Sequence, residues 1–352
     1  MAYTTINDPT DYFNTVLYTG NGGTNAITGV GFQPDLVWLK ERSSTSNHQL
    51  GDSVRGATKY IQPNVEDGES TDSNRFSSFD SDGFTQGANN GVNESGQTYV
   101  AWNWLASNTT ASNTDGSITS TVSANTTSGF SIVSYTGTGT SGTDTFGHGL
   151  GVTPSMVIFK NRTDGSNAKW TTYHKSLTNG ANSYLELNQA NAESNLSLSP
   201  PLFGTPSSTT MGAGHFNSTN GDGDSIIAYC FAEKKGFSKF GSYTGNGSSD
   251  GSFVFCGFKP AFVLMKSSSN VVNWKMHDNK RDSFNDGSGA SINANDNSSE
   301  DDNTAYDIDF LSNGFKQRNN NSNMNSSGYT YIYMAFAENP FTTSTGTPTT
   351  AR

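Results

Sequence analysis

The segment Gly31–Lys40, with the sequence GFQPDLVWLK, returns twice further along the chain. It recurs as GVTPSMVIFK at Gly151–Lys160 and as GFKPAFVLMK at Gly257–Lys266, with glycine, proline, a central valine and the closing lysine in the same places. Proline offers no N–H to a sheet ladder, so it predicts the first residue of a strand. The apolar run behind it does not alternate, so we expect a strand buried on both faces in a sandwich core. The closing lysine is expected to carry the chain back to solvent.

A second motif ends each copy. The segment Gly96–Trp104 (GQTYVAWNW) aligns without gaps with Gly223–Phe231 (GDSIIAYCF), and Gly328–Phe336 (GYTYIYMAF) is the third copy. Glycine in a polar stretch ahead of an apolar run indicates a hairpin turn that leads into a strand. The copies follow one another at intervals of about 105–120 residues, which is the size of a domain rather than of a solenoid repeat.

The composition favours the same fold class. Only 14% of the 352 residues are charged, against about 25% in a typical soluble domain, which argues against a coiled coil or helical bundle. Aromatic residues make up 12% and argue against disorder. We therefore predict an all-β fold of three tandem β-sandwich, jelly-roll-like repeats. The predicted boundaries are 1–106, 117–233 and 234–340 for the repeats, 107–116 for a polar linker, and 341–352 for a flexible tail.

Charge and cysteine content narrow the possible partners. The formal net charge is -11 and no cluster of Lys and Arg is visible, so we expect no nucleic-acid partner and no membrane insertion. The start of the chain lacks the basic and apolar regions of a secretory signal, so we expect synthesis in a cytosol. The two cysteines, Cys230 and Cys256, lie in apolar strand-like runs and are predicted to be free core thiols.

Two stretches carry side chains that could bind a ligand. The segment Asn220–Ser225 resembles part of a calcium loop, but the other copies carry no acid at the places of Asp222 and Asp224, so we expect a structural hairpin. The other stretch starts with a tryptophan in two copies, at Trp170 and Trp274.

Asp278 and Arg281 follow Trp274, and the first copy has Asp52 and Arg55 at the same spacing. This Asp-x-x-Arg pattern predicts a local ion pair. The alternative is a surface aromatic beside an acid that stacks on a sugar ring. Under that alternative the ligand-binding residues are Trp170, Trp274 and Asp278.

The sequence contains little that supports an enzymatic function. The run Glu300–Asp302 is acidic, but it lies in an Asn- and Ser-rich stretch that is typical of a solvated loop. A glycosidase needs two carboxyl groups in distinct environments. The five histidines show no metal-binding spacing. We expect no enzymatic activity, no cofactor and no metal site.

Four segments resemble a repeat family of marine bacteriophage particle proteins: Asp8–Gly20 (DPTDYFNTVLYTG), Gly31–Lys40, Asp52–Ala57 (DSVRGA) and Tyr99–Trp102 (YVAW). The resemblance implies a virion structural component, often labelled tail fibre or particle protein, with concanavalin-like or jelly-roll sandwiches. It implies no catalytic residues. The second copy departs from the pattern, with His174–Leu177 (HKSL) in place of the Asp-x-x-Arg-Gly stretch.

These observations lead to a virion structural protein, a tail fibre or host-attachment component that binds host-surface glycans. One alternative is a capsid decoration or tail-assembly protein without a receptor role, and another is a carbohydrate-binding module or depolymerase. The expected partners are other virion proteins and host-surface polysaccharide. A homo-oligomer is expected, with a trimer suggested by analogy to phage fibres.

Overall fold

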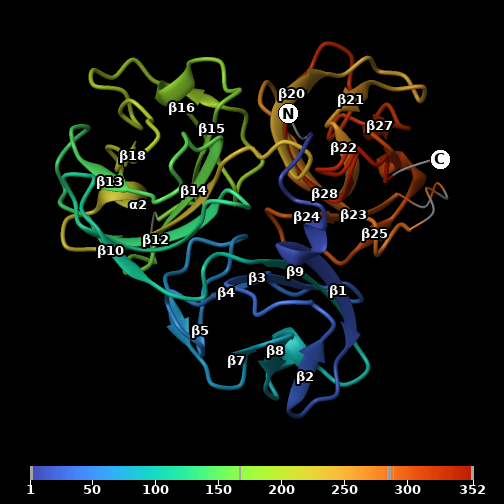
Figure 1. Ribbon diagram of the computed structural model, residues 1–352, viewed down its shortest axis with the longest axis horizontal. Helices are drawn as coiled ribbons and strands as arrows, with labels where there is room; N and C mark the ends of the chain where they lie inside the picture. The colour runs from blue at the N-terminus through green and yellow to red at the C-terminus, as the bar shows by residue number, and fades with distance from the viewer. Residues whose placement is uncertain (1–2, 166–167, 284, 286, 288, 350–352) are drawn as a thin grey trace.

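Antiparallel β-sheets gather in three lobes around a common centre (Figure 1). The structure is a computed structural model that describes residues 3–165, 168–283, 285, 287 and 289–349. We call the sheets that lie before residue 107 lobe 1, those between 107 and 233 lobe 2, and those after 234 lobe 3. The helices in the described residues have three or four residues each: η1 (Pro9–Asp11), α1 (Asn90–Asn93), η2 (Gly180–Asn182), α2 (Asn217–Asn220) and η3 (Thr304–Tyr306). The predicted all-β fold class is confirmed.

Lobe 1 pairs a four-stranded sheet with a three-stranded one, and a short hairpin lies beside them. The large sheet has the order β1 (Phe13–Thr19), β9 (Thr98–Trp104), β3 (Leu36–Glu41) and β4 (Gln49–Asp52). The small sheet has the order β2 (Asn25–Thr28), β8 (Gly83–Gln86) and β7 (Phe76–Asp80), and the hairpin consists of β5 (Lys59–Tyr60) and β6 (Ser70–Thr71).

Lobe 2 has an eight-stranded sheet and a two-stranded one. The large sheet has the order β10 (Ala111–Asn113), β11 (Ser120–Asn125), β12 (Phe130–Thr136), β19 (Ser225–Phe231), β14 (Met156–Asn161), β15 (Thr171–His174), β16 (Ser183–Glu186) and β17 (Ser194–Asn195). The small sheet consists of β13 (Thr145–Gly147) and β18 (Thr210–Gly212). Strand β10 lies inside the segment predicted to be a linker, so that segment extends the sheet instead of spanning free.

Lobe 3 has a six-stranded sheet and a three-stranded one. The large sheet has the order β20 (Ser238–Thr244), β28 (Thr330–Pro340), β22 (Phe258–Ser267), β23 (Lys275–Asp278), β24 (Ala290–Asn293) and β25 (Asp301–Asp302). The small sheet has the order β21 (Phe253–Phe255), β27 (Gly314–Gln317) and β26 (Ile308–Leu311).

The repeated sequence motifs occupy corresponding strands of the three large sheets. The proline motif forms β3, β14 and β22, and the closing motif forms β9, β19 and β28. In each sheet the closing strand lies between the proline-motif strand and an earlier strand of the same lobe, which is β1, β12 or β20. The sheets therefore share a strand order, β1-β9-β3-β4 in lobe 1, β12-β19-β14-β15 in lobe 2 and β20-β28-β22-β23 in lobe 3.

The proline-motif strands are buried on both faces, as their unalternating apolar runs predict. Along β3, Leu36 and Trp38 point to one cluster of apolar side chains, and Val37 and Leu39 point to another. The second cluster lies inside lobe 1, between its two sheets. The first, which we call the central core, draws buried residues from all three lobes. Each large sheet lies between the small sheet of its own lobe and the central core. One face of the large sheet therefore packs on the small sheet, and the other face is covered by the neighbouring lobes.

The lysines that close these strands are buried, so the expectation that they reach solvent is wrong. Lys40, Lys160 and Lys266 are each 0% exposed. Each ammonium group donates to backbone carbonyl oxygens, as Lys266 does to Ser267 and Asn270. The central core removes the solvent that such a lysine would meet at the edge of an isolated sandwich. The two cysteines are free and buried, as predicted.

Ion pairs join the lobes in a repeating manner. Arg42 of lobe 1 makes a two-pronged pair with Glu300 of lobe 3, at 2.9 and 2.8 Å. Arg162 of lobe 2 makes the same pair with Glu69 of lobe 1, at 2.8 and 3.0 Å. At the matching place in lobe 3 the residue is Ser268, and the contact with lobe 2 consists of a backbone hydrogen bond from Glu193 at 2.8 Å.

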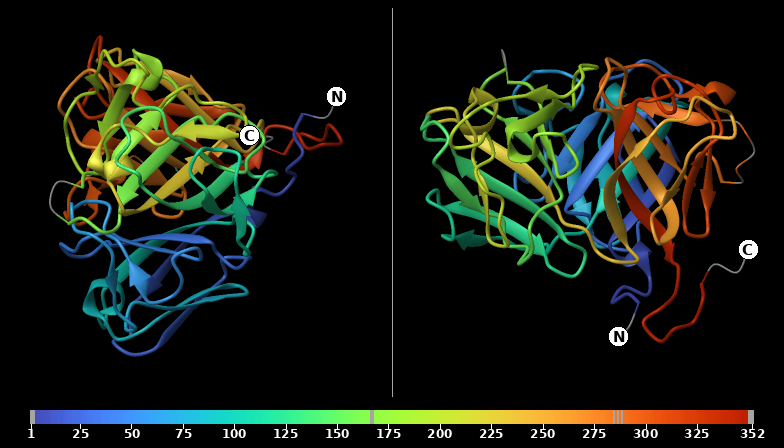
Figure 2. Two further views of the ribbon diagram at one scale, coloured as in Figure 1. Left: turned by 90° about the vertical axis from the view of Figure 1, so that its left-hand side faces the viewer. Right: turned by 90° about the horizontal axis from the view of Figure 1, so that it is seen from above.

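Both ends of the chain lie on the same side of the molecule (Figure 2). The ring of Tyr3 is 6.3 Å from the ring of Phe341, and the backbone N–H of Ser344 donates to the Asn7 side chain at 2.8 Å. Thr342 and Pro348 form an isolated bridge, which closes residues 342–348 into a loop. Residues 350–352 of the predicted tail lie outside the described residues.

Candidate functional site

The two tryptophans proposed as sugar platforms lie in the central core. Trp170 is 0% exposed and Trp274 is 1% exposed. The indole N–H of Trp170 donates to the backbone carbonyls of Gln62 and Val65 in lobe 1, at 3.1 Å each. That of Trp274 donates to the carbonyl of Glu186 in lobe 2 at 3.1 Å. The expectation of a surface platform is therefore wrong, because neighbouring lobes cover both rings.

His48, which stands at the place of the tryptophans in the first copy, makes the same kind of contact. Its Nδ1 accepts from the indole of Trp38 at 2.9 Å, so Nε2 carries the proton and donates to the carbonyl of Asn293 in lobe 3 at 2.9 Å. His48, Trp170 and Trp274 thus occupy equivalent positions, and each donates a ring N–H to the backbone of a neighbouring lobe.

Asp278 is also buried, at 1% exposed, so it cannot act as a surface ligand group. The local ion pair that its spacing predicts is present, with Arg281 Nε 2.6 Å from Asp278 Oδ2. The equivalent pair in lobe 1, between Arg55 and Asp52, has a distance of 2.5 Å. Trp102 of lobe 1 donates to Asp278 at 3.0 Å. Each ion pair lies within one lobe, and its aspartate accepts a hydrogen bond from a neighbouring lobe, Asp278 from Trp102 and Asp52 from Tyr229.

The calcium-loop stretch forms the turn before β19. Gly223 has φ +73°, a conformation that favours glycine, and Asp224 Oδ2 accepts from Asn161 Nδ2 at 2.7 Å. Within the described ranges, no group of three or more His, Cys, Asp or Glu side chains is placed to hold a metal ion. None of the helices in the described part of the chain is long and apolar enough to cross a membrane.

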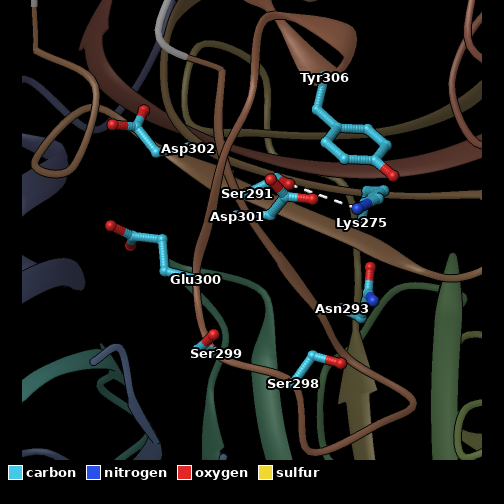
Figure 3. Close-up of a pocket in the computed structure, with 9 residues that line it drawn as sticks. All are labelled: Lys275, Ser291, Asn293, Ser298, Ser299, Glu300, Asp301, Asp302 and Tyr306. Carbon is cyan, nitrogen blue, oxygen red and sulfur yellow. Dashed lines mark hydrogen bonds between the residues drawn. The ribbon is translucent and has the colours of Figure 1, made fainter. Parts of the chain in front are cut away.

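A pocket with a polar lining opens in lobe 3, beside the outer strands of its large sheet (Figure 3). Its volume is about 310 Å³, which is near the lower end of the range for small-molecule sites. The pocket is lined by Lys275, Ser291, Asn293, Ser298, Ser299, Glu300, Asp301, Asp302 and Tyr306. It therefore presents amine, amide, hydroxyl and carboxylate groups together with one aromatic ring.

Lys275 is the most buried of the charged residues that line the pocket. Its residue is 2% exposed, and its ammonium nitrogen lies 3.3 Å from Ser291 Oγ and 3.3 Å from the centre of the Tyr306 ring (Figure 3). Burial lowers the pKa of Lys275 to about 8, while the charges of Asp301 and Asp296 act in the opposite direction. The amine therefore remains mostly protonated at neutral pH.

Glu300 belongs to the contact between lobes and to the pocket at once. Burial acts to raise its pKa, but the hydrogen bond from Arg42 and the charge of Arg281 outweigh burial and lower the pKa below its ordinary value. This carboxylate is therefore ionised and balanced by two guanidinium groups.

Lobe 2 has a smaller pocket at the equivalent place of its sheet. Its volume is about 200 Å³, and it is lined by Lys169, Thr171, Tyr184, Glu186, Phe216, Asn217 and Ser218. Thr171 pairs with Glu186 in the sheet register as Lys275 pairs with Asn293 in lobe 3. Lys169 and Glu186 form an ion pair at 3.0 Å.

The equivalent place in lobe 1 is occupied by an arginine. The guanidinium of Arg75 lies 3.9 Å from the centre of the Tyr60 ring and donates to the Gln49 side chain. Gln49 holds the same register position relative to Asp52 as Lys275 holds relative to Asp278.

The residues of the lobe 3 pocket were present in the sequence, but their grouping was not visible there. The sequence around Glu300–Asp302 is typical of a solvated loop, and nothing in it links these residues to Lys275, which lies between Trp274 and Asp278. The hairpin of β24 and β25 places Asp301 opposite Ser291, next to the strand that carries Lys275. The one available signal was Lys275 itself, a lysine directly after Trp274 in a strand whose residues are all buried.

The fold and the pocket together define an all-β protein of paired sheets with a polar pocket beside the outer strands of one large sheet. The chain belongs to the family described as Domain of unknown function (DUF7483), whose sequence model matches residues 8–340. Comparison with curated proteins and with solved structures found no match.

Proposed function

We propose that the protein is a structural component of a bacteriophage particle, a tail fibre or host-attachment protein, that binds glycans on the host surface without cleaving them. The observation that carries the binding role is the pair of polar pockets at equivalent places in lobes 2 and 3. Hydroxyl, amide and carboxylate groups beside an aromatic ring suit the hydroxyl groups of sugars. Several weak sites on one particle add to its avidity without tight individual binding.

The virion assignment rests on the resemblance of segments such as Asp8–Gly20 and Asp52–Ala57 to phage particle proteins. The partners of this proposal are other virion proteins, which anchor the chain to the particle. The chain itself forms a homo-oligomer, a trimer by analogy with phage fibres.

The absence of catalysis is part of the proposal. A retaining or inverting glycosidase requires one carboxyl group that stays protonated near neutral pH. Glu300, the pocket carboxylate that lies nearest the lobe contact, has a lowered pKa because of Arg42 and Arg281, so it is poorly suited to act as a general acid.

The test is to incubate the purified protein with the polysaccharide of the host surface and to analyse both binding and chain length. We expect co-sedimentation with polysaccharide of unchanged length. Shortened chains would favour a depolymerase. No binding at any ionic strength would favour a capsid decoration or tail-assembly protein without a receptor role.

A further inference from the structure

The lobe 3 pocket has both donors and acceptors free to meet a ligand. Lys275 forms one hydrogen bond, to Ser291, and no ion pair within the described residues. The Oδ1 atom of Asn293 is buried without a hydrogen-bond partner in the described structure. Asp301 is exposed and faces the Lys275 amine across the pocket (Figure 3). A buried amide oxygen without a partner is unfavourable unless a ligand satisfies it.

The charges of the pocket select against ionic ligands. Glu300 is balanced by Arg42 and Arg281, which leaves the Lys275 amine and the Asp301 carboxylate as the charges that face the pocket without an ion pair in the described structure. An anion would meet the Asp301 carboxylate, and a cation would meet the buried ammonium. A neutral hydroxyl group meets neither penalty, because it donates to a carboxylate or amide oxygen and accepts from an amine or hydroxyl.

We infer that the lobe 3 pocket binds the ring of a neutral hexose unit, with Asp301 and Asn293 accepting from its hydroxyl groups and Lys275 donating to one of them. This inference rests on the proposed glycan-binding function and names the sugar class and the site. Ser298 and Ser299 line the same opening and add hydroxyl groups.

Comparison of the lobes explains why lobe 3 holds the principal site. In lobe 2 the amine of Lys169 and the carboxylate of Glu186 already bind each other, so a sugar would have to displace that pair. In lobe 1 the side chain of Arg75 takes the place of a ligand against Tyr60 and Gln49. In lobe 3, by contrast, the amine of Lys275 and the carboxylate of Asp301 form no ion pair with each other in the described structure, so both can meet a sugar.

The experiment is saturation-transfer NMR on the full chain. The probes are the methyl glycosides of glucose, galactose and mannose at up to about 100 mM, a concentration that saturates sites of millimolar affinity. Sodium glucuronate and glucosamine carry a negative and a positive charge on the same ring as glucose. The variants are Asp301→Ala in the pocket and Asp222→Ala as a control, since both aspartates are exposed.

We expect transfer to at least one neutral glycoside, weaker transfer to both charged analogues, and an affinity about tenfold lower in Asp301→Ala, as for loss of one charge-assisted hydrogen bond. Asp222→Ala should match the parent chain. Lys275→Gln, checked for folding by circular dichroism, should also weaken binding. The inference is overturned if no neutral glycoside binds, if a charged analogue binds more tightly, or if Asp301→Ala has no effect.

These outcomes separate the inference from the proposed function. Glycoside binding by a protein that is not found on the particle would contradict the proposed function and support the inference. Polysaccharide binding by the parent chain that Asp301→Ala leaves intact would contradict the inference and support the proposed function.

Discussion

The hydroxyl of Tyr229 in lobe 2 donates to the carboxylate of Asp52 in lobe 1 at 2.7 Å, with both groups buried. The register of the closing strands places Trp102 of lobe 1 at the position of Tyr229, and its indole donates to Asp278 of lobe 3. The third member of the set, Met334 of lobe 3, has a side chain without an N–H or O–H to donate. The acid that would receive such a bond is replaced in lobe 2 by His174.

This relationship accounts for the departure of the second copy from the Asp-x-x-Arg pattern. His174 is buried, and burial lowers its pKa to about 3, so it is neutral. Its Nδ1 accepts from the backbone of Ser176, and its Nε2 donates to the carbonyl of Tyr333 in lobe 3 at 3.2 Å. A buried aspartate facing Met334 would lack a side-chain donor from lobe 3, and a buried unpaired charge is strongly destabilising.

Tyr229→Phe should lower the free energy of unfolding by about 1.5–3 kcal/mol, the range for a hydrogen bond to a charged group. The ring stays in the central core, so the loss isolates the contact between lobes 1 and 2. Urea unfolding measures it. Tyr329→Phe, at a half-buried tyrosine of lobe 3, is the control and should change stability by less than about 0.5 kcal/mol. Equal effects of the two variants would contradict the assignment.

Ser268→Arg should stabilise the contact between lobes 2 and 3, because it restores the residue found at Arg42 and Arg162. Glu193 of lobe 2 already donates its backbone N–H to the carbonyl of Ser268, as Glu69 does to Arg162. We expect a gain of about 1 kcal/mol in the free energy of unfolding. The gain should disappear when Glu193→Gln is added. A gain that survives Glu193→Gln would show that the arginine acts in another way.

Lys266 should make stability depend on pH on the alkaline side of neutrality. Burial lowers its pKa to about 7 in the folded chain, whereas an unfolded lysine has a pKa of about 10.4. Between these values the unfolded chain binds more protons, so the free energy of unfolding rises as pH rises from 7 to 10. In Lys266→Met that rise should be smaller. Lys280→Met, at an exposed lysine, should leave the slope unchanged, and an unchanged slope in Lys266→Met would refute the prediction.

Trp170→Phe should lower stability without altering glycan binding by the folded protein. The variant keeps most of the ring in the central core but removes the N–H that meets Gln62 and Val65. The carbonyl of Val65 loses this donor, and that of Gln62 keeps only the backbone N–H of Val65 at 3.3 Å, so we expect a loss of about 1–3 kcal/mol. Saturation transfer to the neutral glycosides, measured at a temperature where the variant is folded, should equal that of the parent. Reduced saturation transfer would contradict this prediction and show that Trp170 contributes to glycan binding.

The repeated motifs were sufficient to predict the fold class and the strands that are buried on both faces. They were insufficient for the surroundings of those strands, because a sandwich considered alone leaves Lys40 and Trp170 at its outer face, in solvent. In the complete chain Lys40 and Trp170 are buried instead, because the outer face of each large sheet packs on the two other lobes. The pocket was missed for the same reason, because Lys275 and Asp301 meet only through the pairing of β23, β24 and β25.

The proposed role as a virion protein is tested most directly by locating the chain on an intact phage particle. Antibody fragments against the exposed loops of lobe 3, viewed by electron microscopy on particles of the phage proposed to encode the chain, provide the measurement. We expect labelling of the tail fibres or another host-contacting tail structure. Labelling at capsid lattice positions, or of no part of the particle, would contradict it.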